Sequence, residues 1–349
     1  MMVQETQVVS ITDGSNVAEA RRLAVRLAER LGFEESERGK VALVVTEMVS
    51  NVVKHVRQGG ELLLHPIAAG GVAGLELLCL DQGPGMANLA GALRDGYSTA
   101  GTPGTGLGAI RRLSASFDVH SAPGLGTAVL ARLWAEPSAG RDPVALMASG
   151  AVRVPLPGQD VCGDDWSARQ RPDQMQILVA DGLGHGQEAA RAARAAVKIF
   201  RESAWLSPER LVEAMHAGMR HTRGAAVAVA QINVAQREVR FAGIGNIAAI
   251  IVSPGSNHHL VSHNGTAGHT AYKIQEFVYP WSPQALLVMH SDGLTSRWSL
   301  DPYPALIGRN PSLIAAVLYR DFKRGRDDAA VVVVKQPQVS QPLVAQQAG

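Results

Sequence analysis

Residues 41–56, VALVVTEMVSNVVKHV, decide the first half of the fold. Their apolar side chains recur at helical spacing, at Val41, Val44, Val45, Met48, Val52 and Val56. This stripe predicts a helix whose apolar face packs on a sheet. Glu47 and Asn51 lie one turn apart on another face of the same helix. For an isolated pair of this kind, a solvated polar surface is the ordinary interpretation.

Two later segments change that interpretation. The strand-like run LELLCLD ends on Asp81 and leads directly to Gly83 and Gly85. A carboxylate at a strand end can accept the exocyclic amine of adenine, and the glycines let the backbone turn closely around a base. Asp95 to Gly108, DGYSTAGTPGTGLG, is a glycine-rich loop that opens into a helix, as a phosphate-binding loop requires. In this order the segments predict a nucleotide site.

These motifs resemble those of the GHKL ATPase superfamily, and within it the small anti-sigma and switch kinases of the RsbW and RsbT type. The RsbT type is the nearer, through RDGYST at 94–99 and SAPGLGTAV at 121–129. The resemblance implies that ATP binds with Mg²⁺, and that Asn51 holds this ion. It also implies that Asp81 reads adenine and that Glu47 orients or deprotonates the attacking hydroxyl. The ATP-binding residues that it implies are Asn51, Asp81, Gly83, Gly85, Thr105, Gly106, Gly108 and Thr127.

Four acidic segments in the second half share one pattern, an Asp at the end of an apolar run and beside Gly or another Asp. They are CGDDW (Asp164, Asp165), LVADGLGHG (Asp181), LVMHSDGL (Asp292) and GRDDAAVVVVK (Asp327, Asp328). A single Asp-Gly is usually a turn, but strand ends can bring four such positions together across a sheet. Converging carboxylates repel one another unless cations lie between them. Oxygen ligands suit Mg²⁺ or Mn²⁺, so the pattern predicts a site for these ions.

This set resembles the PPM-type metal-dependent phosphatases of the SpoIIE and RsbX branch, over Val152 to Lys335. The resemblance implies two Mn²⁺ or Mg²⁺ ions that activate a bridging water. The metal ligands that it implies are Asp164, Asp181 with the Gly182 carbonyl, Asp292 and Asp327. Asp165 stands where many relatives have Ser, and the choice between Asp164 and Asp165 as the direct ligand stays open.

The pattern of the chain changes at EPSAGRD, residues 136–142, which is small, polar and contains Pro and Gly. The predicted divisions are a nucleotide-binding domain at 1–136, a linker at 137–142, a phosphatase domain at 143–336 and a tail at 337–349. Helical periodicity dominates early in the first domain, and short strand-like runs dominate the second. The predicted fold class is α+β, with an N-terminal GHKL-type α/β sandwich and a C-terminal PPM-type β-sandwich flanked by helices.

Composition excludes several functional classes. The 33 basic and 31 acidic residues leave a net charge of +2, which gives no reason to expect a nucleic-acid partner. No secretory signal or bilayer-length apolar run is visible, and Cys79 and Cys162 lie in separate domains, so a cytoplasmic location without membrane attachment is expected. Four histidines crowd one polar segment, at His258, His259, His263 and His269. Without a cysteine or regular ligand spacing, they indicate a solvated loop between strands rather than a zinc site.

Together the two halves resemble a fusion of a switch kinase with a phosphatase. The first hypothesis is a bifunctional enzyme that phosphorylates and dephosphorylates Ser/Thr on STAS-domain partners, either anti-sigma-factor antagonists or stressosome-type phosphoproteins. The alternative is a phosphatase governed by a non-catalytic domain that senses ATP and docks partners. A third possibility, a scaffold with neither activity, is disfavoured by the intact acidic set.

Overall fold

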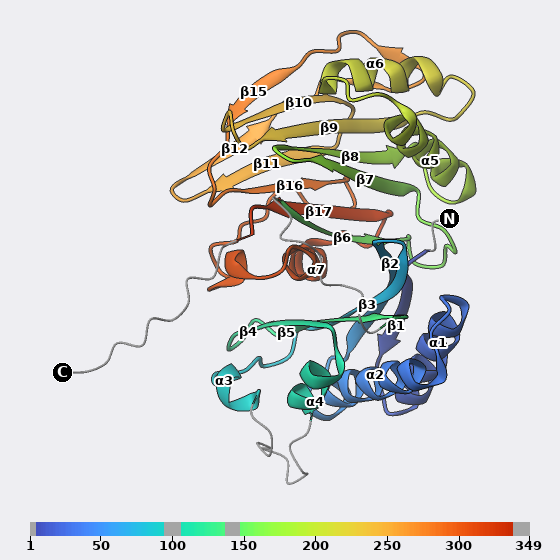
Figure 1. Ribbon diagram of the computed structural model, residues 1–349, viewed down its shortest axis with the longest axis vertical. Helices are drawn as coiled ribbons and strands as arrows, with labels where there is room; N and C mark the ends of the chain where they lie inside the picture. Colours follow the sequence, from blue (N-terminus) through green and yellow to red (C-terminus); the bar gives the residue numbers. More distant parts are fainter. Residues whose placement is uncertain (1–4, 94–105, 137–146, 338–349) are drawn as a thin grey trace, which may run out of the picture.

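The N-terminal half folds around one five-stranded antiparallel sheet. In the computed structural model, which describes residues 5–93, 106–136 and 147–337, the strand order is β1-β2-β3-β5-β4. The strands are β1 (Gln7–Ile11), β2 (Gly60–Ala69), β3 (Val72–Asp81), β4 (Ser116–Ser121) and β5 (Thr127–Trp134). Helices α1 (Ser15–Arg30), α2 (Glu35–His55) and α4 (Gly106–Leu113) cover one face, and α3 (Leu89–Ala92) is a single turn after β3 (Figure 1).

Both faces of this sheet are buried, which explains the nearly continuous apolar runs of β2 and β3. Successive side chains of a strand point to opposite faces. Leu62, Leu75 and Leu77 therefore pack with the apolar stripe of α2 in one core. Their neighbours Leu63 and Leu78 belong to a different core on the other face.

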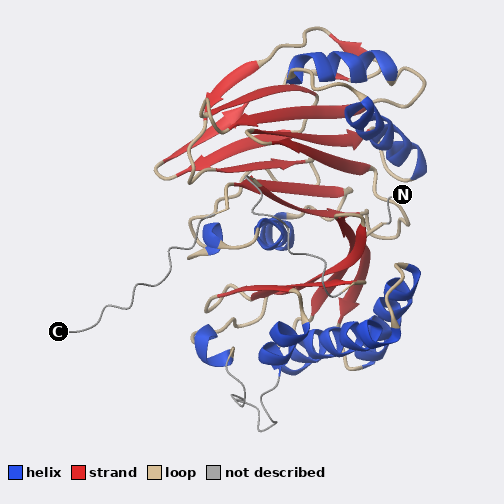
Figure 2. Ribbon diagram, viewed as in Figure 1, coloured by secondary structure: helices blue, strands red, loops and turns tan. Residues whose placement is uncertain are grey.

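The C-terminal half is a sandwich of two five-stranded antiparallel sheets with orders β15-β10-β9-β8-β7 and β12-β11-β16-β17-β6. The strands of the first sheet are β7 (Asp164–Arg171), β8 (Gln174–Gly182), β9 (Ala225–Asn233), β10 (Glu238–Ile244) and β15 (Phe277–Pro280). Those of the second are β6 (Ala148–Val154), β11 (Ala248–Ser253), β12 (Ser256–Leu260), β16 (Leu286–His290) and β17 (Ala329–Lys335). Helices α5 (Gln187–Glu202) and α6 (Pro208–Gly218) cover the outer face of the first sheet (Figure 2). A small hairpin, β13 (Gly265–Thr266) and β14 (Thr270–Ala271), and the short helix η1 (Leu306–Gly308) complete this half.

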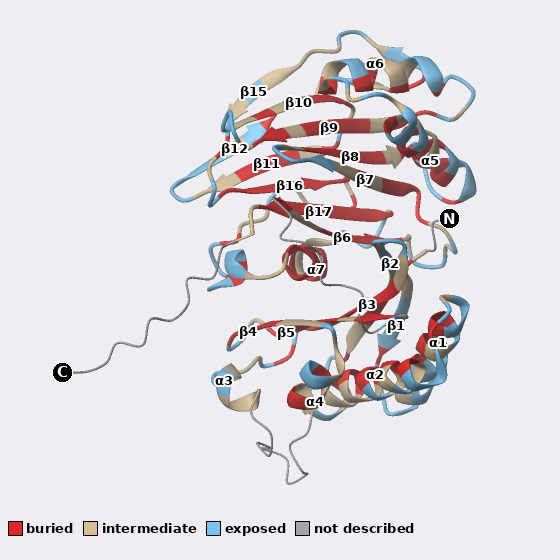
Figure 3. Cartoon of the chain, in the orientation of Figure 1, coloured by how far each residue is buried: buried red, intermediate tan, exposed pale blue. Residues whose placement is uncertain are grey.

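Helix α7 (Pro311–Phe322) lies between the two halves. It packs on β6 and β17 of the second half and on β3 and β5 of the first. Every residue from Pro311 to Arg320 is buried, as the uniformly buried helix in Figure 3 shows. One apolar cluster joins this helix to both sheets, with Leu78 and Leu130 from one side and Val288 and Val331 from the other.

Polar contacts surround this shared core. The Arg320 Nη1 donates to the Asp81 carbonyl oxygen at 2.9 Å, and Lys323 pairs with Glu61. Farther along, the Asn310 backbone N–H donates to the Asp118 carboxylate at 2.7 Å. These bonds satisfy polar groups that the interface removes from water, so they fix the orientation of the two halves as well as their contact.

The predicted α+β class is confirmed, and the helix predicted from the stripe in residues 41–56 corresponds to the C-terminal part of α2. The prediction of a loop for the histidine-rich segment is wrong in part, because His258 and His259 lie on β12, paired with β11. The predicted linker at 137–142 lies outside the described residues, as does nearly all of the predicted tail. Among the helices of the described ranges, none has the length and apolarity needed to cross a membrane.

The position of α7 predicts a large effect of removing one of its apolar side chains. Ile314 is fully buried in the shared core, so Ile314→Ala should lower the free energy of unfolding by about 2–5 kcal/mol. The matched control is Ile307→Ala, because Ile307 is 40% exposed and should lose no more than about 1 kcal/mol. Urea denaturation of both variants measures the difference. Equal losses would contradict the shared core.

Candidate functional site

The first group of predicted site residues gathers where β3 ends. Asp81 is buried and lies opposite Thr127 of β5 in the strand register. Its Oδ1 accepts the backbone N–H groups of Gly83 at 2.8 Å and Thr127 at 3.2 Å. Burial raises the pKa of the Asp81 carboxyl, and these two hydrogen bonds oppose that rise. The carboxylate is therefore held in one orientation by the backbone around it.

The glycines after Asp81 allow a close approach of two chain segments. A Cβ on Gly85, which has φ +67°, would lie 1.9 Å from the Ala122 carbonyl oxygen. A Cβ on Gly126 would lie 2.1 Å from the Asp81 carbonyl oxygen. Neither position admits a side chain, so the turn after β3 depends on glycine.

Glu47 and Asn51 lie on one face of α2, half-buried, and α4 begins beside them. A Cβ on Gly106 would lie 3.2 Å from both the Oδ1 and the Nδ2 of Asn51. Gly108 is buried in the same first turn of α4. The N-terminus of α4 is thereby brought to the proposed Mg²⁺ ligand, which is an arrangement that favours an anion. Thr105, the remaining predicted nucleotide residue, lies outside the described residues.

The second group gathers at the ends of β7 and β8. Asp164 and Asp181 are directly opposite each other in the register. Burial, followed by the charge of Asp181, raises the pKa of Asp164. Burial, followed by the charges of Asp292 and Asp327, raises the pKa of Asp181 to about 7. These mutual effects show that the carboxyl groups of four separate segments occupy one region.

A cavity of about 460 Å³ opens at this region, and Asp181, Asp292 and Asp327 line it. Asn246, which also lines it, donates from Nδ2 to the Asp292 Oδ2 at 2.7 Å. Gly182 and Gly293 permit the close packing behind the cavity. A Cβ on Gly182 would lie 2.0 Å from the Ala189 carbonyl oxygen, and a Cβ on Gly293 would lie 1.9 Å from the Asp328 carbonyl oxygen.

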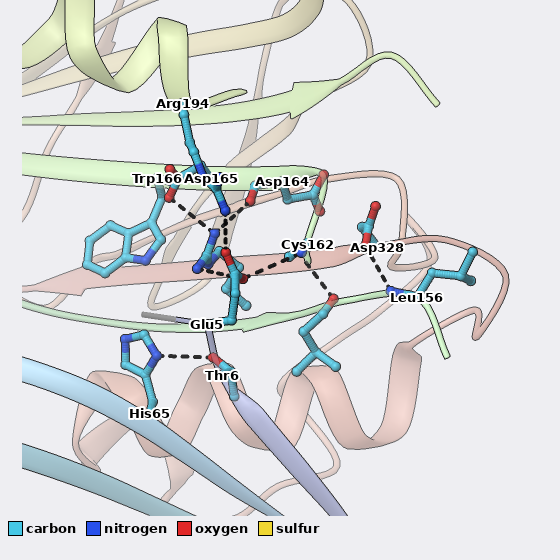
Figure 4. A network of polar contacts seen from close by, with 12 residues as sticks. Glu5, Thr6, His65, Leu156, Cys162, Asp164, Asp165, Trp166, Arg194 and Asp328 are labelled. Carbon is cyan, nitrogen blue, oxygen red and sulfur yellow. Dashed lines mark hydrogen bonds and ion pairs between the residues drawn. The ribbon is translucent and has the colours of Figure 1, made fainter. Parts of the chain in front are cut away.

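Asp164 and Asp165 point to opposite sides of β7. The Asp165 Oδ1 accepts the Trp166 backbone N–H at 2.9 Å and lies 3.7 Å from the Arg153 Nη1. Arg153 also pairs with Glu5, at 2.9 Å (Figure 4). The Asp165 side chain thus belongs to a buried network with Arg153, while Asp164 faces the acidic group. We propose Asp164 as the direct metal ligand of the two.

The donor set fits a hard divalent cation. The Oδ2 atoms of Asp164, Asp165 and Asp328 are buried and lack hydrogen-bond partners among the described residues, and unpartnered buried carboxylate oxygens are costly. In the same described ranges, no group of three or more Asp, Glu, His or Cys side chains meets the geometry of a metal site. A bound ion would therefore complete its coordination with water and backbone oxygens, as Mg²⁺ commonly does.

The sequence did not predict three other residues of these sites. Asn246 fixes Asp292, Arg320 binds the carbonyl of Asp81, and Arg153 accompanies Asp165. Asn246 has a local signal, since it ends the strand-like run FAGIGN, where a polar residue can face a site. Arg320 and Arg153 have none, because their partners are distant in the chain.

Known relatives exist for each half. The family profile described as "Histidine kinase-like ATPase domain" matches residues 12–133, and that described as "Stage II sporulation protein E (SpoIIE)" matches residues 171–337. The serine/threonine-protein kinase RsbT of Bacillus subtilis (strain 168) is 30% identical over 119 residues, which are 34% of this chain and 89% of that protein. The phosphoserine phosphatase RsbX of the same organism is 26% identical over 138 residues, which are 39% of this chain and 69% of that protein.

A solved structure described as "The bacterial stressosome: a modular system that has been adapted to control secondary messenger signaling" is 25% identical. Its TM-score is 0.51, and the match covers 54% of this chain and 99% of that chain. The fold and the relatives define a fusion of a GHKL-type ATPase domain with a PPM-type phosphatase domain. Through its N-terminal half the chain belongs to the RsbT family, and its C-terminal half is a SpoIIE domain of the PP2C type.

The crowding of carboxylates predicts that Asp181 destabilises the metal-free protein. Because its folded pKa of about 7 lies above the ordinary 3.8, ionisation of Asp181 opposes folding progressively as the pH rises between these values. Asp181→Asn should therefore raise the free energy of unfolding at pH 8 by about 1–4 kcal/mol, with a smaller gain near pH 4.

Urea denaturation in excess chelator at the two pH values measures this gain. The matched control is Asp301→Asn, which replaces an exposed carboxylate and should change little at either pH. A loss of stability in Asp181→Asn, or a gain that does not depend on pH, would contradict the electrostatic account.

Proposed function

We propose that this protein is a bifunctional signalling enzyme that adds and removes phosphate on Ser/Thr of STAS-type partners. The observation that carries the phosphatase half is the convergence of Asp181, Asp292 and Asp327 on one cavity with Asp164 behind them. The kinase half is supported by the similarity to RsbT, and the class of partner by the stressosome structure. We place the activity in the cytoplasm, where the two unpaired, buried cysteines would persist.

In the phosphatase half, Asp181 and the Gly182 carbonyl would help to hold two Mn²⁺ or Mg²⁺ ions. Asp164, Asp292 and Asp327 would complete the protein ligands. When bound, such ions lower the pKa of water and polarise the phosphoryl oxygens. Asn246 would hold Asp292 in position through the amide hydrogen bond described above.

The phosphatase is tested with an aryl phosphate and the purified chain. Hydrolysis should require Mn²⁺ or Mg²⁺, stop in excess chelator, and fall at least about 100-fold in Asp292→Asn because one ligand of the cations is lost. Asp301→Asn serves as the control and should keep full activity. Full hydrolysis in chelator, or by Asp292→Asn, would rule out the two-metal proposal.

In the kinase half, Asp81 would accept the adenine amine and Asn51 would hold Mg²⁺ against the phosphates. Glu47, one helical turn before Asn51, would orient or deprotonate the attacking hydroxyl. The half-buried position of Glu47 on the same face as Asn51 supports this role. Phosphoryl transfer needs mainly positioning and charge neutralisation, so a small set of groups is sufficient.

The kinase is tested with labelled ATP and a STAS-domain partner. The phosphatase is first inactivated by Asp181→Asn, so that the product accumulates. Adding Glu47→Ala should then reduce labelling by at least about 100-fold while ATP binding, measured by calorimetry, stays within a few-fold. Absence of labelling by the Asp181→Asn protein with any STAS-domain partner would contradict the kinase.

A second function, in which the bound nucleotide sets the phosphatase rate, is favoured by the contacts of α7. Its Arg320 binds the carbonyl of Asp81, and Gln82 donates to Asp321 at 3.0 Å. Four residues after Arg320, the Arg324 backbone N–H donates to the Gly293 carbonyl oxygen at 2.8 Å. The end of α7 therefore contacts the residue that would read adenine, and the segment directly after α7 contacts the residue that follows Asp292, a proposed metal ligand.

This second function predicts that ATP, ADP and nucleotide-free conditions give different rates of aryl phosphate hydrolysis. Asp81→Asn should make the three rates equal, because a lost charge-assisted hydrogen bond weakens nucleotide binding by about 1.5–3 kcal/mol while the carbonyl that Arg320 binds is retained. Steady-state rates at saturating Mn²⁺ provide the measurement. Identical wild-type rates in all three conditions would contradict nucleotide control.

A further inference from the structure

The turn after α6 lies beside the phosphatase cavity and has a fixed backbone. Leu183, which lines the cavity, donates its backbone N–H to the Gly224 carbonyl oxygen at 3.0 Å. The Thr222 hydroxyl donates to the Met219 carbonyl at 2.7 Å and accepts the Gly224 N–H at 3.0 Å. From the other side, a ring nitrogen of His269 lies 3.0 Å from the Thr222 carbonyl oxygen. Residue 223 is therefore anchored on both sides.

The side chain at this anchored position is an arginine whose positive charge has no partner among the described residues. Arg223 is exposed, and no hydrogen bond or ion pair joins its guanidinium to any residue of the described parts of the chain. Its Nη1 lies 3.4 Å from the position that a Cβ would take on Gly184. Gly184 lines the cavity together with Asp181. The guanidinium is thus at the cavity mouth, against a lining residue, and it pairs with none of the lining carboxylates.

This combination fits the chemistry of a phosphate monoester. A guanidinium presents its N–H donors in a planar fork that matches two phosphoryl oxygens, and such charge-assisted pairs are strong. Once cations neutralise the carboxylates, the cavity attracts an anion, and a free arginine at its mouth adds to that attraction. An ordinary solvated arginine would need neither the anchored turn nor a position against a lining residue.

We propose that Arg223 binds the phosphoryl group of the substrate at the mouth of the phosphatase cavity. The fork donates to two non-bridging oxygens, so Arg223 is a substrate-binding residue that recognises the phosphoryl group. This inference rests on the proposed phosphatase function and names the group that recognises its substrate. It requires no change in the metal ligands, because none of them contacts Arg223.

The test uses the full chain loaded with Mn²⁺, with p-nitrophenyl phosphate as substrate and inorganic phosphate as competitor. Arg223→Gln should raise both the KM for the ester and the inhibition constant of phosphate about 10- to 100-fold, with a smaller change in kcat. Arg223→Lys, which keeps the charge but loses the fork, should fall in between. The matched control is Arg220→Gln, because Arg220 is exposed on the same segment and should leave both constants unchanged.

Calorimetric titration of phosphate into the Mn²⁺-loaded protein separates this inference from the proposed function. If the wild type hydrolyses the ester and Arg223→Gln leaves KM and phosphate affinity unchanged, Arg223 has no such role although the phosphatase stands. A loss confined to kcat would likewise overturn it. If the wild type hydrolyses nothing, the proposed phosphatase function is wrong. Phosphate binding that weakens in Arg223→Gln but not in Arg220→Gln would still support the anion site at Arg223. Equal phosphate binding by all variants would overturn the role of Arg223.

Discussion

The burial of α7 between two sheets is the constraint on which the arrangement of the whole protein depends. A helix that is apolar on all sides is stable only when every side is covered. Here the sheet of the ATPase domain covers one side and the β-sandwich covers the other, in one continuous apolar cluster. The two domains are consequently not independent bodies joined by a linker, since large apolar interfaces restrict relative motion. The same helix sets the separation between the proposed nucleotide site and the proposed metal site, because Arg320 contacts the Asp81 carbonyl and Arg324, just beyond the end of the helix, contacts Gly293.

The acidic centre differs from this core, because its crowded carboxylates lower the stability of the metal-free protein. The same carboxylates are the groups that would bind cations. Burial raises the pKa values of Asp164, Asp181 and Asp292, and the charges of neighbouring carboxylates raise them further. Such strain persists only where the surrounding structure is strong. The sandwich core and the glycines behind the cavity supply that structure. Close by, Arg153 is matched by Asp165 and by Glu5, a residue of the first half that reaches into the second (Figure 4). Arg194 also pairs with Glu5, at 2.7 Å, so two arginines offset two carboxylates in this neighbouring network without a metal ion.

The sequence predicted those parts of the fold whose pattern is local. The stripe of α2 repeats with a helical period, the run AAVVVVK of β17 is continuously apolar, and the Asp-Gly pairs mark strand ends. Helix α7 was not predicted, because PSLIAAVLYRDF has no polar face from which a helical period can be recognised. The orientations of Asp164 and Asp165 follow from strand alternation only once the pairing of β7 with β8 is known. The bond from Arg320 to Asp81 joins residues 239 apart, and no local motif indicates it.

The central claim is that carboxylates from four separate segments form one two-metal centre. Anomalous diffraction at the manganese edge, from crystals of the wild type grown with Mn²⁺, tests this claim most directly. The account predicts two anomalous peaks in the cavity, both in contact with Asp181 and one of them with Asp292. A single peak bound elsewhere, or an acidic cavity that stays free of Mn²⁺ at millimolar concentration, would contradict it.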